Sequence, residues 1–412
     1  MKMGRRISKA FFFSALARGL YTVNNLVIFA LVGRGLGVRD LGLFGGSFFF
    51  YNLAAVLSGW GMVVYFGKET AYCRERQEER RRLVGENNSA LLVGGGFSLM
   101  LALLLPSFYK ALSPELLFLA VLAGIVTGWE RNLSGFFLGE ERMVEEFFCQ
   151  LLLLTLTTLP LLLWRGWNLS LLYVVRTAAF LLVNLIKLSL LRGRFPFFSP
   201  LFRSSFHWKE TGSFLLSEIV IFLEKQGDLF ILTLLIAPEA LAAYFLAMRI
   251  YQGFCLFAEV ANLGLTPFIS RSFRGMEELS YNTLRKISLW SLFLFGSLFG
   301  VFLFLFRRPL AALFSPESAS QTASFLLPLS LLLAFRFVSF GTGNMLTATR
   351  HQPLRFVLNS LCALVMLVGF VLAGKFYGVW GILAVRIGGD LLLFLLNGGA
   401  LLYVSRRDAV NP

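Results

Sequence analysis

The sequence predicts an all-helical membrane protein of about twelve transmembrane helices, arranged as two pseudo-symmetric lobes of six helices each. Three observations support this prediction. Apolar residues make up 57% of the 412 residues, and the mean hydropathy is +0.72. The second half of the chain repeats the pattern of the first half. Lys and Arg concentrate in every second loop, as they do in proteins that cross a membrane several times.

Long apolar segments fill most of the chain. A helix needs roughly 20 apolar residues to cross a bilayer, whereas a soluble domain averages about 45–50% apolar residues and lacks such runs. Between these segments there is no polar stretch long enough to form a separate soluble domain. We expect transmembrane helices at approximately residues 11–33, 41–65, 88–108, 114–138, 146–164, 169–191, 213–236, 240–269, 287–306, 322–347, 355–374 and 378–404.

The internal repeat is visible as three ordered matches between the two halves. These are LGLFGGSFFFYNL from Leu41 with LAAYFLAMRIYQGF from Leu241, LGEERMVEEFFCQ from Leu138 with LTATRHQPLRFVLN from Leu346, and GWNLSLLYVVR ending at Arg176 with GVWGILAVR ending at Arg386. Because each half has an even number of spans, both halves enter the membrane in the same orientation, which is a parallel repeat. We expect lobes at residues 1–197 and 213–412, joined by a cytoplasmic linker at 198–212.

The formal net charge of +15 lies mainly in one set of loops, which argues against a nucleic-acid partner. The basic clusters are at residues 2–9, 68–82, 192–209, 271–286, 350–355 and 406–407. The positive-inside bias therefore places both termini in the cytoplasm, which requires an even number of spans. We expect a multi-pass protein of the cell inner (plasma) membrane.

The sequence contains no motif of a common enzyme or metal site. Walker-type, zinc and nucleophile-elbow motifs are absent, and the four cysteines lack metal-binding spacing. The first apolar segment contains Arg18, Asn24 and Asn25 and no convincing cleavage site, so it is predicted to be an uncleaved first helix. We expect no enzymatic activity and no metal or other cofactor.

Charged residues inside the predicted spans are the candidate functional residues. A charge at the bilayer centre costs at least about 2.5–3.5 kcal/mol, so these side chains should line a cavity, pair with each other or reach the surface. Arg18, Thr22 and Asn25 form one polar stripe at helical spacing. The predicted substrate-binding residues are Arg18, Asn25, Arg131, Lys225, Arg249 and Arg336.

Two acidic residues of the seventh span, Asp228 and Glu224, are candidates for binding a coupling ion. Lys225 can reach Asp228 at i+3 and neutralise it, which leaves a structural role open. We expect Arg18, Lys225, Asp228 and Arg249 to line a cavity between the lobes.

Other intramembrane charges favour a structural interpretation. Arg386 and Asp390 are spaced to form a buried pair, and Lys187 is expected to reach the membrane surface with its ammonium group. Glu130 and Arg131 are adjacent and should point in different directions. Glu259 has no obvious local partner.

Bases outnumber acids within the spans, which favours an anionic substrate. Arginine offers bidentate geometry to phosphate or pyrophosphate. A cavity for organic cations would instead need carboxylates without matching bases, together with aromatic walls.

Residues 225–254, KQGDLFILTLLIAPEALAAYFLAMRIYQGF, and residues 31–53, LVGRGLGVRDLGLFGGSFFFYNL, resemble the multidrug/oligosaccharidyl-lipid/polysaccharide (MOP) flippase superfamily. The chain most resembles its polysaccharide-transporter branch, the O-antigen (Wzx-type) lipid-linked oligosaccharide flippases. The resemblance implies a two-lobed, MATE-like fold that works by alternating access. It also implies transport of an undecaprenyl-pyrophosphate-linked oligosaccharide from the cytoplasmic to the periplasmic leaflet. Arg18, Asp228 and Arg249 match positions where members of the family place charged cavity groups.

The resemblance further implies an H⁺ or Na⁺ gradient as energy source, and a polysaccharide polymerase and a chain-length regulator as partners. A multidrug cation antiporter of the same fold and a lipid II-type flippase are the alternatives. The second is weakened because the chain lacks two C-terminal spans that the longer lipid II flippases have. A membrane glycosyltransferase or polymerase would need a large outer loop, and every predicted outer loop is short. A lipid scramblase or an assembly scaffold remains open.

Overall fold

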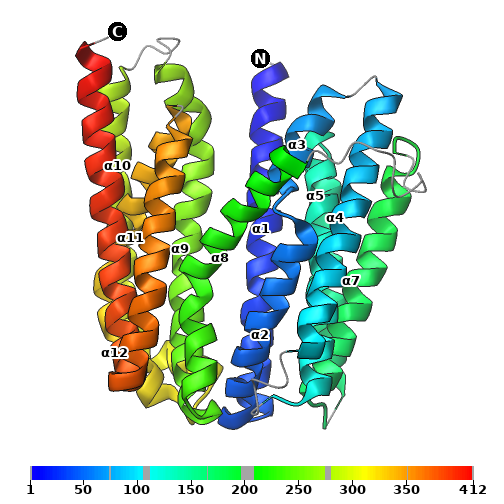
Figure 1. The fold of residues 1–412 in the computed structure, drawn as a ribbon, viewed down its shortest axis with the longest axis vertical. Helices are drawn as coiled ribbons and strands as arrows, with labels where there is room; N and C mark the ends of the chain where they lie inside the picture. The colour runs from blue at the N-terminus through cyan, green and yellow to red at the C-terminus, as the bar shows by residue number, and fades with distance from the viewer. Residues whose placement is uncertain are drawn as a thin grey trace. The chain divides into compact units, whose positions relative to one another are not determined.

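A computed structural model describes residues 2–73, 76–104, 112–164, 166–195, 208–273, 280–349 and 351–410. Within these ranges the chain forms α-helices and no strand (Figure 1). The helices are α1 (Lys2–Gly35), α2 (Val38–Gly59), α3 (Val63–Tyr72), α4 (Gln77–Leu104), α5 (Pro114–Gly139), α6 (Met143–Leu163), α7 (Leu169–Leu191), α8 (Trp208–Leu235), α9 (Pro238–Phe273), α10 (Tyr281–Phe314), α11 (Ala319–Ala348) and α12 (Gln352–Val410).

Ten of these helices are long and apolar enough to cross a membrane, so the protein is a multi-pass membrane protein. Helix α12 contains both of the last two predicted spans, and a kink at Gly378 with a φ of 58° separates them. Helix α8 contains most of the seventh predicted span, residues 213–236, but it is not among these ten helices. The prediction of an all-helical membrane fold is confirmed.

The chain divides into two compact units. The first unit comprises residues 1–36 and 43–222, and the second comprises residues 37–42 and 223–412. The division therefore falls inside α8, after Phe222. Most of the linker predicted at 198–212 lies outside the described residues, because the structure describes nothing from 196 to 207.

Small residues bring the helices of the first unit close together. A Cβ atom on Gly94 of α4 would lie 2.0 Å from the carbonyl oxygen of Leu57 on α2. A Cβ atom on Gly124 of α5 would lie 2.2 Å from the carbonyl oxygen of Tyr51. Only glycine permits this backbone approach, which lets α2 pack tightly against both neighbours.

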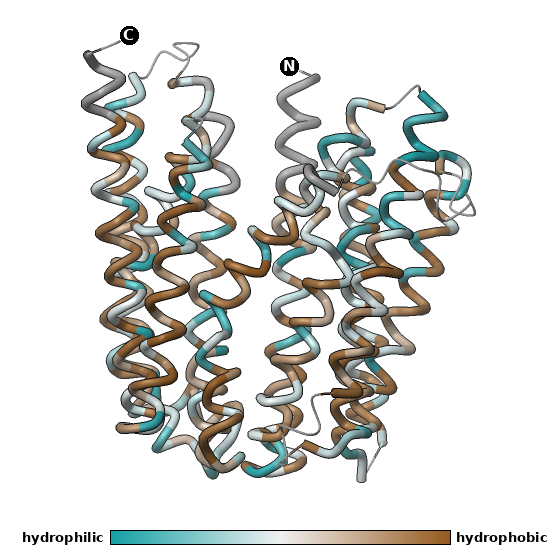
Figure 2. The backbone as a smooth tube through the Cα atoms, viewed as in Figure 1, coloured by the Kyte–Doolittle hydropathy of each residue, from teal (hydrophilic) through white to brown (hydrophobic). Residues whose placement is uncertain are grey.

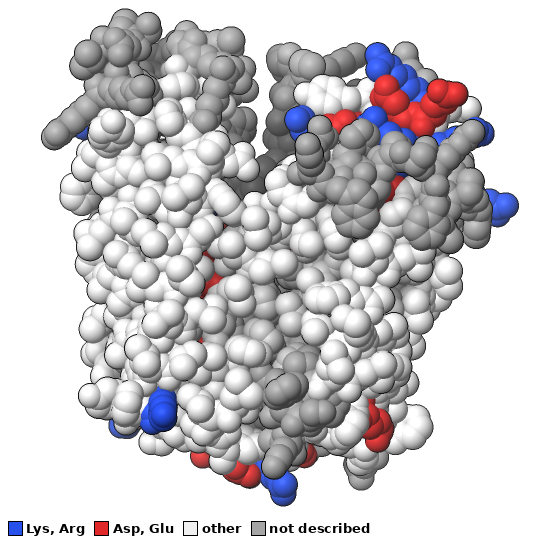
Figure 3. Space-filling model, in the orientation of Figure 1, with Lys and Arg blue, Asp and Glu red and all other residues white. Residues whose placement is uncertain are grey.

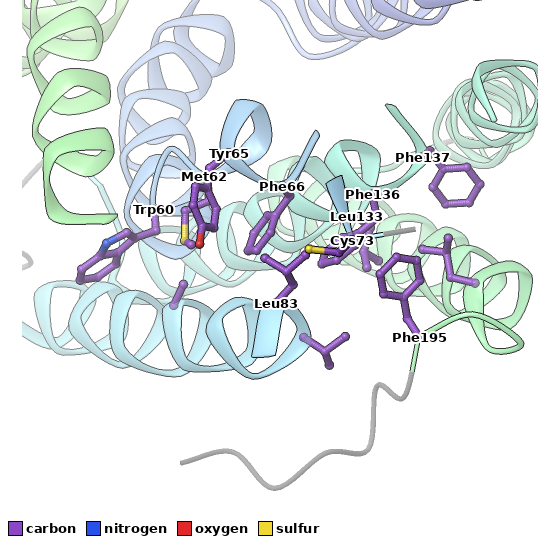
Figure 4. Close-up of a cluster of buried hydrophobic side chains, with 13 residues drawn as sticks. Trp60, Met62, Tyr65, Phe66, Cys73, Leu83, Leu133, Phe136, Phe137 and Phe195 are labelled. Atoms are coloured by element: carbon purple, nitrogen blue, oxygen red, sulfur yellow. The ribbon is translucent and has the colours of Figure 1, made fainter. Parts of the chain in front are cut away.

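An aromatic cluster fills one end of the first unit (Figure 4). The rings of Phe66 on α3 and Phe136 on α5 stack with their centroids 4.8 Å apart. Phe195, just after α7, meets Phe136 edge-on. This packing fixes the short helix α3 against α5 and the end of α7.

On the visible surface of the first unit, charged side chains lie mainly at the ends of the helices (Figure 3). Figure 2 shows mainly apolar helix centres, and Figure 3 shows acidic and basic atoms gathered at one end. At such an end, Glu140 after α5 forms ion pairs with Arg80 (3.1 Å) and with Arg194. The uncharged sides are the surface expected to face lipid.

In the second unit, glycines bring α10 and α11 together. A Cβ atom on Gly296 would lie 2.8 Å from the Cα atom of Ala334, and one on Gly300 would lie 2.6 Å from the carbonyl oxygen of Ser330. Both units therefore use small residues for close helix packing.

Candidate functional site

Arg176 on α7 is fully buried in the first unit, and its hydrogen-bond partners are neutral. Its Nη2 atom donates to Oδ1 of Asn25 at 2.7 Å and to the hydroxyl of Tyr51 at 2.8 Å. Its Nε and Nη1 atoms have no hydrogen-bond partner among the described residues. No carboxylate in the described part of the chain lies within ion-pair distance of Arg176. A buried guanidinium without a counter-charge is costly and attracts an anion.

Aromatic rings surround the Arg176 guanidinium. Its central carbon lies 4.5 Å from the ring centroid of Tyr51, 5.7 Å from that of Phe180 and 5.8 Å from that of Phe48. The faces of these rings stabilise the cation in part. The hydroxyl of Tyr51 is held by Thr127 of α5 at 2.8 Å. This contact fixes the ring that carries most of the cation–π interaction.

A second arginine lies near this group. Arg131 on α5 donates to the hydroxyl of Tyr21 at 3.2 Å, and both Arg131 and Arg176 act electrostatically on that hydroxyl. Glu218 is the carboxylate that acts on Arg131. We call Tyr21, Asn25, Tyr51, Arg131 and Arg176 the arginine site. Tyr21, Asn25 and Arg131 are partly exposed, whereas Tyr51 and Arg176 are buried.

Of the polar stripe predicted on α1, which is Arg18, Thr22 and Asn25, only Asn25 belongs to the arginine site. Asn25 donates its amide to the carbonyl oxygen of Tyr21 at 3.1 Å, which turns its Oδ1 atom towards Arg176. Thr22 donates to the carbonyl oxygen of Arg18 at 3.2 Å. The side chain of Arg18 is exposed. The structure thus brings together Asn25 and Arg131 of the predicted residues.

The second unit holds a buried charge network in place of an uncompensated cation. Arg336 on α11 donates to Glu224 at 2.8 Å and to Asp390 at 3.0 Å. The Nε atom of Arg386 lies 3.8 Å from Asp390, and its Nη1 atom lies 4.0 Å from Asp228. The predicted pair of Arg386 and Asp390 is therefore present, as part of a larger group.

Two tyrosines of α9 complete this charge network. The hydroxyl of Tyr244 donates to Asp228 at 2.6 Å, and the hydroxyl of Tyr251 donates to Asp390 at 3.1 Å. All the members are buried. We call Glu224, Asp228, Tyr244, Tyr251, Arg336, Arg386 and Asp390 the charge network. It neutralises Arg336, which the sequence placed among the substrate-binding residues, with two carboxylates.

Lys225 pairs with Glu259 of α9 at 2.8 Å. The i+3 contact of Lys225 with Asp228 that the spacing allows is not the observed ion pair, because Asp228 accepts from Tyr244 and lies near Arg386. Glu259, for which the sequence offered no local partner, is the residue that pairs with the lysine.

Arg249 on α9 is buried and bonded to glutamines. It donates to Gln252 at 2.7 Å and to Gln226 at 3.3 Å, and its guanidinium lies over the ring of Phe245. Gln252 also donates to the carbonyl oxygen of Lys225 at 3.2 Å. The predicted residues Lys225 and Arg249 are therefore neighbours in one polar group of the second unit.

Lys187 does not extend to the membrane surface, contrary to the expectation from its position. Its side chain is 0% exposed, and its Nζ atom lies 2.6 Å from Glu130 and 2.7 Å from Glu146. The two carboxylates compensate the charge of the buried ammonium. As expected, Glu130 and the adjacent Arg131 point to different partners.

Alignment of the repeats explains why the two units differ. Arg176 aligns with Arg386, and at the same spacing Phe180 takes the place of Asp390. At the offset that aligns Leu41 with Leu241, Asn24 takes the place of Glu224. The first repeat therefore has neutral residues where the second has carboxylates. Sequence reasoning missed Arg176 as a site residue, although this alignment contains the signal.

The matches to two family models and the shared fold place the chain in a class of membrane transporters, the MOP superfamily. The chain belongs to the polysaccharide biosynthesis protein family, whose model matches residues 7–273. The MatE family model matches residues 215–372. A comparison with curated proteins finds no match.

Several solved structures share the fold of the whole chain at low sequence identity. An inward-facing multidrug resistance MATE family transporter has a TM-score of 0.74 and 16% identity, covering 93% of this chain and 95% of that chain. The lipid II flippase MurJ, in an inward closed conformation, has a TM-score of 0.75 and 14% identity, covering 97% and 87%. A MOP superfamily transporter from Pyrococcus furiosus, described as having a binding pocket of reverse polarity, has a TM-score of 0.64 and 17% identity, covering 98% and 95%.

Proposed function

We propose that the protein is a flippase for polysaccharide biosynthesis. It moves an undecaprenyl-pyrophosphate-linked oligosaccharide from the cytoplasmic to the periplasmic leaflet of the inner membrane by alternating access, with both termini in the cytoplasm. Membership of the polysaccharide biosynthesis protein family supports a role in polysaccharide biosynthesis. The observation that carries the proposal is the buried guanidinium of Arg176, whose hydrogen bonds go only to Asn25 and Tyr51.

The chemistry of the arginine site suits a pyrophosphate. The Nε and Nη1 atoms of Arg176 offer three N–H donors that no described residue accepts. Charge-assisted hydrogen bonds from arginine to phosphate oxygens are among the strongest in proteins. Arg131 supplies a second cation near the same tyrosines. A pyrophosphate at this site would both satisfy these donors and neutralise the buried charge.

The charge network of the second unit suits a structural role. It connects α8, α9, α11 and α12 through ion pairs between buried side chains. Removing one member would leave an uncompensated buried charge, so the network holds these helices in one arrangement. A unit that moves as a rigid body during alternating access needs such internal connections. A gradient of H⁺ or Na⁺ is proposed as the energy source, and a polymerase and a chain-length regulator as partners.

A multidrug cation antiporter is the second candidate, favoured by the MatE match to residues 215–372. Such a transporter would bind its substrate with carboxylates. In the second unit, however, Glu224 and Asp390 already bind Arg336. A lipid II-type flippase is the third candidate, supported by the fold shared with MurJ.

Complementation of three bacterial hosts separates these candidates. The hosts lack, respectively, their O-antigen flippase, their lipid II flippase and their main drug antiporter. We expect the protein to restore surface polysaccharide in the first host only, and Arg176→Gln to abolish this restoration at matched expression. Arg81 is an exposed residue of α4, so Arg81→Ala is the control and should act like wild type. Restored drug resistance or restored lipid II transport, without restored polysaccharide, would replace the proposal.

A further inference from the structure

The second unit contains a polar group where α11 ends and α12 begins, apart from the charge network. Arg355 lies in the first turn of α12, and its Nη1 atom donates to the hydroxyl of Thr347 on α11 at 2.8 Å. Thr347 in turn donates to the carbonyl oxygen of Gly343, one turn earlier in α11, at 3.1 Å. These two hydrogen bonds hold the guanidinium of Arg355 against α11.

Arg355 has no carboxylate within ion-pair distance among the described residues. The charges that act on it are those of Glu224 and Arg336, and these two residues form an ion pair with each other at 2.8 Å. The hydrogen bond to Thr347 uses one of the five N–H donors of the guanidinium. No other side chain or carbonyl oxygen of the described residues accepts from the remaining donors. Arg355 therefore offers both a positive charge and N–H groups to an anion.

Asn397, in the second half of α12, borders the same space as Arg355. A Cβ atom on Gly343 would lie 3.1 Å from Nε of Arg355 and 3.5 Å from Nδ2 of Asn397. The missing side chain at Gly343 therefore lets these two nitrogen atoms converge beside α11. Asn397 is only 2% exposed, and its amide group has no hydrogen-bond partner among the described residues. A buried amide without a partner costs free energy, which a ligand at this place would recover.

A second asparagine without a hydrogen-bond partner lies close by. Asn359 follows Arg355 by four residues, so both side chains lie on one face of α12. It is 8% exposed, and its Oδ1 atom has no partner among the described residues. The two halves of α12 run antiparallel, because a Cβ atom on Gly369 would lie 2.8 Å from the side chain of Val385. Continuing this register places Asn397 at the level of Arg355 and Asn359.

The chemistry and the place of this group suit a phosphate. Arginine binds phosphate oxygens through strong charge-assisted hydrogen bonds, and the asparagine amides add neutral donors and acceptors. The group lies between the end of α11 at Ala348 and the first turns of α12, whose N-terminus also favours negative charge. Lipid headgroups lie at the level where transmembrane helices end. Basic pockets between such helices bind anionic headgroups.

We propose that Arg355, Asn359 and Asn397 form a binding site for a phosphate group, supplied by an anionic phospholipid headgroup or by a free phosphate. Arg355 provides the charge, the two asparagines bind the remaining oxygen and hydroxyl groups, and Gly343 provides the room for them to converge. This inference does not depend on the identity of the transported substrate.

Binding of two probes to the purified protein tests the proposal. The first probe is phosphatidylglycerol, whose retention is measured by native mass spectrometry and compared with that of zwitterionic phosphatidylcholine. The second probe is inorganic phosphate, added as a competitor for phosphatidylglycerol and titrated alone by calorimetry. All proteins carry Arg176→Gln, so that the arginine site of the first unit does not contribute.

We expect this parent protein to retain phosphatidylglycerol in preference to phosphatidylcholine. Arg355→Gln should weaken the binding about tenfold to hundredfold, because a charge-assisted hydrogen bond is lost. Asn397→Ala removes a neutral partner and should weaken it about twofold to tenfold. Lys286→Gln removes the same charge from an exposed residue of α10 and should bind like the parent. Competition by inorganic phosphate would show that the site also takes free phosphate, and its failure to compete would assign the site to the lipid headgroup.

A glycine pair tests the geometry without removing a charge. Gly343→Leu fills the space between Arg355 and Asn397 and should abolish the binding of both probes. Gly399→Leu is the control, because a Cβ atom there meets nothing within 4 Å. Thermal unfolding shows which variants are folded, and if Arg355→Gln is not, Asn397→Ala and Gly343→Leu decide.

Two results would overturn the proposal. One is a parent protein that binds neither phosphatidylglycerol nor inorganic phosphate. The other is binding as tight as that of the parent in every folded variant of Arg355, Asn397 and Gly343, which would place the anion elsewhere.

Discussion

Arg176 and Arg386 occupy equivalent positions in the two repeats, but Arg176 donates to the neutral Asn25 and Tyr51, whereas Arg386 lies 3.8 Å from Asp390. The same residue therefore carries an uncompensated charge in one unit and a compensated charge in the other. Duplicated halves give a protein two copies of each position. Here one copy is bonded to neutral side chains, and the other is part of the charge network.

This difference predicts opposite effects on stability. Arg386→Gln leaves Asp228 and Asp390 with less positive charge and should destabilise the protein by about 3–5 kcal/mol. Arg176→Gln removes a buried cation that has no carboxylate partner among the described residues, so it should leave stability unchanged or raise it. The thermal unfolding temperature of the two purified variants checks both. A larger loss for Arg176→Gln than for Arg386→Gln would contradict the assignment of the two roles.

Close packing of α2 against α4 predicts a contrast between two glycines of α4. A Cβ atom at Gly94 would lie 2.0 Å from the carbonyl oxygen of Leu57, whereas one at Gly96 would meet nothing within 4 Å. Gly94→Ala should therefore destabilise by about 1–3 kcal/mol through overpacking. Gly96→Ala should be neutral or stabilise by up to about 1 kcal/mol through helix propensity. Equal unfolding temperatures for the two variants would show that the helices are not this close.

The thiol of Cys73, in the turn after α3, should react slowly. Burial, together with the hydrogen bond to Glu79 at 2.9 Å, raises the pKa of Cys73 to about 12. Only the thiolate reacts, so at pH 8 about one thiol in ten thousand would be reactive. Glu79→Gln removes the negative charge and should speed labelling with iodoacetamide, in a protein whose other cysteines are replaced by alanine. Fast labelling of the parent protein at pH 8 would refute the buried, protonated thiol.

The same shift has a defined effect on stability. Because the pKa of Cys73 is higher in the folded protein than in the unfolded chain, the folded state binds more protons between about pH 9 and pH 12. Stability should therefore fall as the pH rises through this window, and Cys73→Ala should reduce the slope. Identical slopes for the two proteins would argue against the shift.

Sequence patterns predicted the helices well where local signals set their ends. The span expected at 169–191 matches α7, because Asn168 caps its first turn by accepting from the amide of Leu171 at 2.9 Å. Ser113 and Pro114 likewise mark the start of α5. The site was predicted less completely. Spacing along one helix identifies neighbours such as Lys225 and Asp228, but the observed partner, Glu259, is 34 residues away. Lys187 and Glu130 are 57 residues apart, and only tertiary packing brings them together.

Pyrophosphate binding by the purified protein tests most directly the proposal that Arg176 binds the pyrophosphate of the substrate. The measurement is the affinity of the detergent-solubilised protein for a short-chain prenyl pyrophosphate. Loss of a charge-assisted hydrogen bond costs about 1.5–3 kcal/mol, so Arg176→Gln should weaken binding about tenfold to hundredfold. Arg176→Lys should restore part of this loss, because it keeps the charge but not the planar fork, and Arg81→Ala should bind like wild type. Unchanged affinity in a folded Arg176→Gln variant would contradict the account.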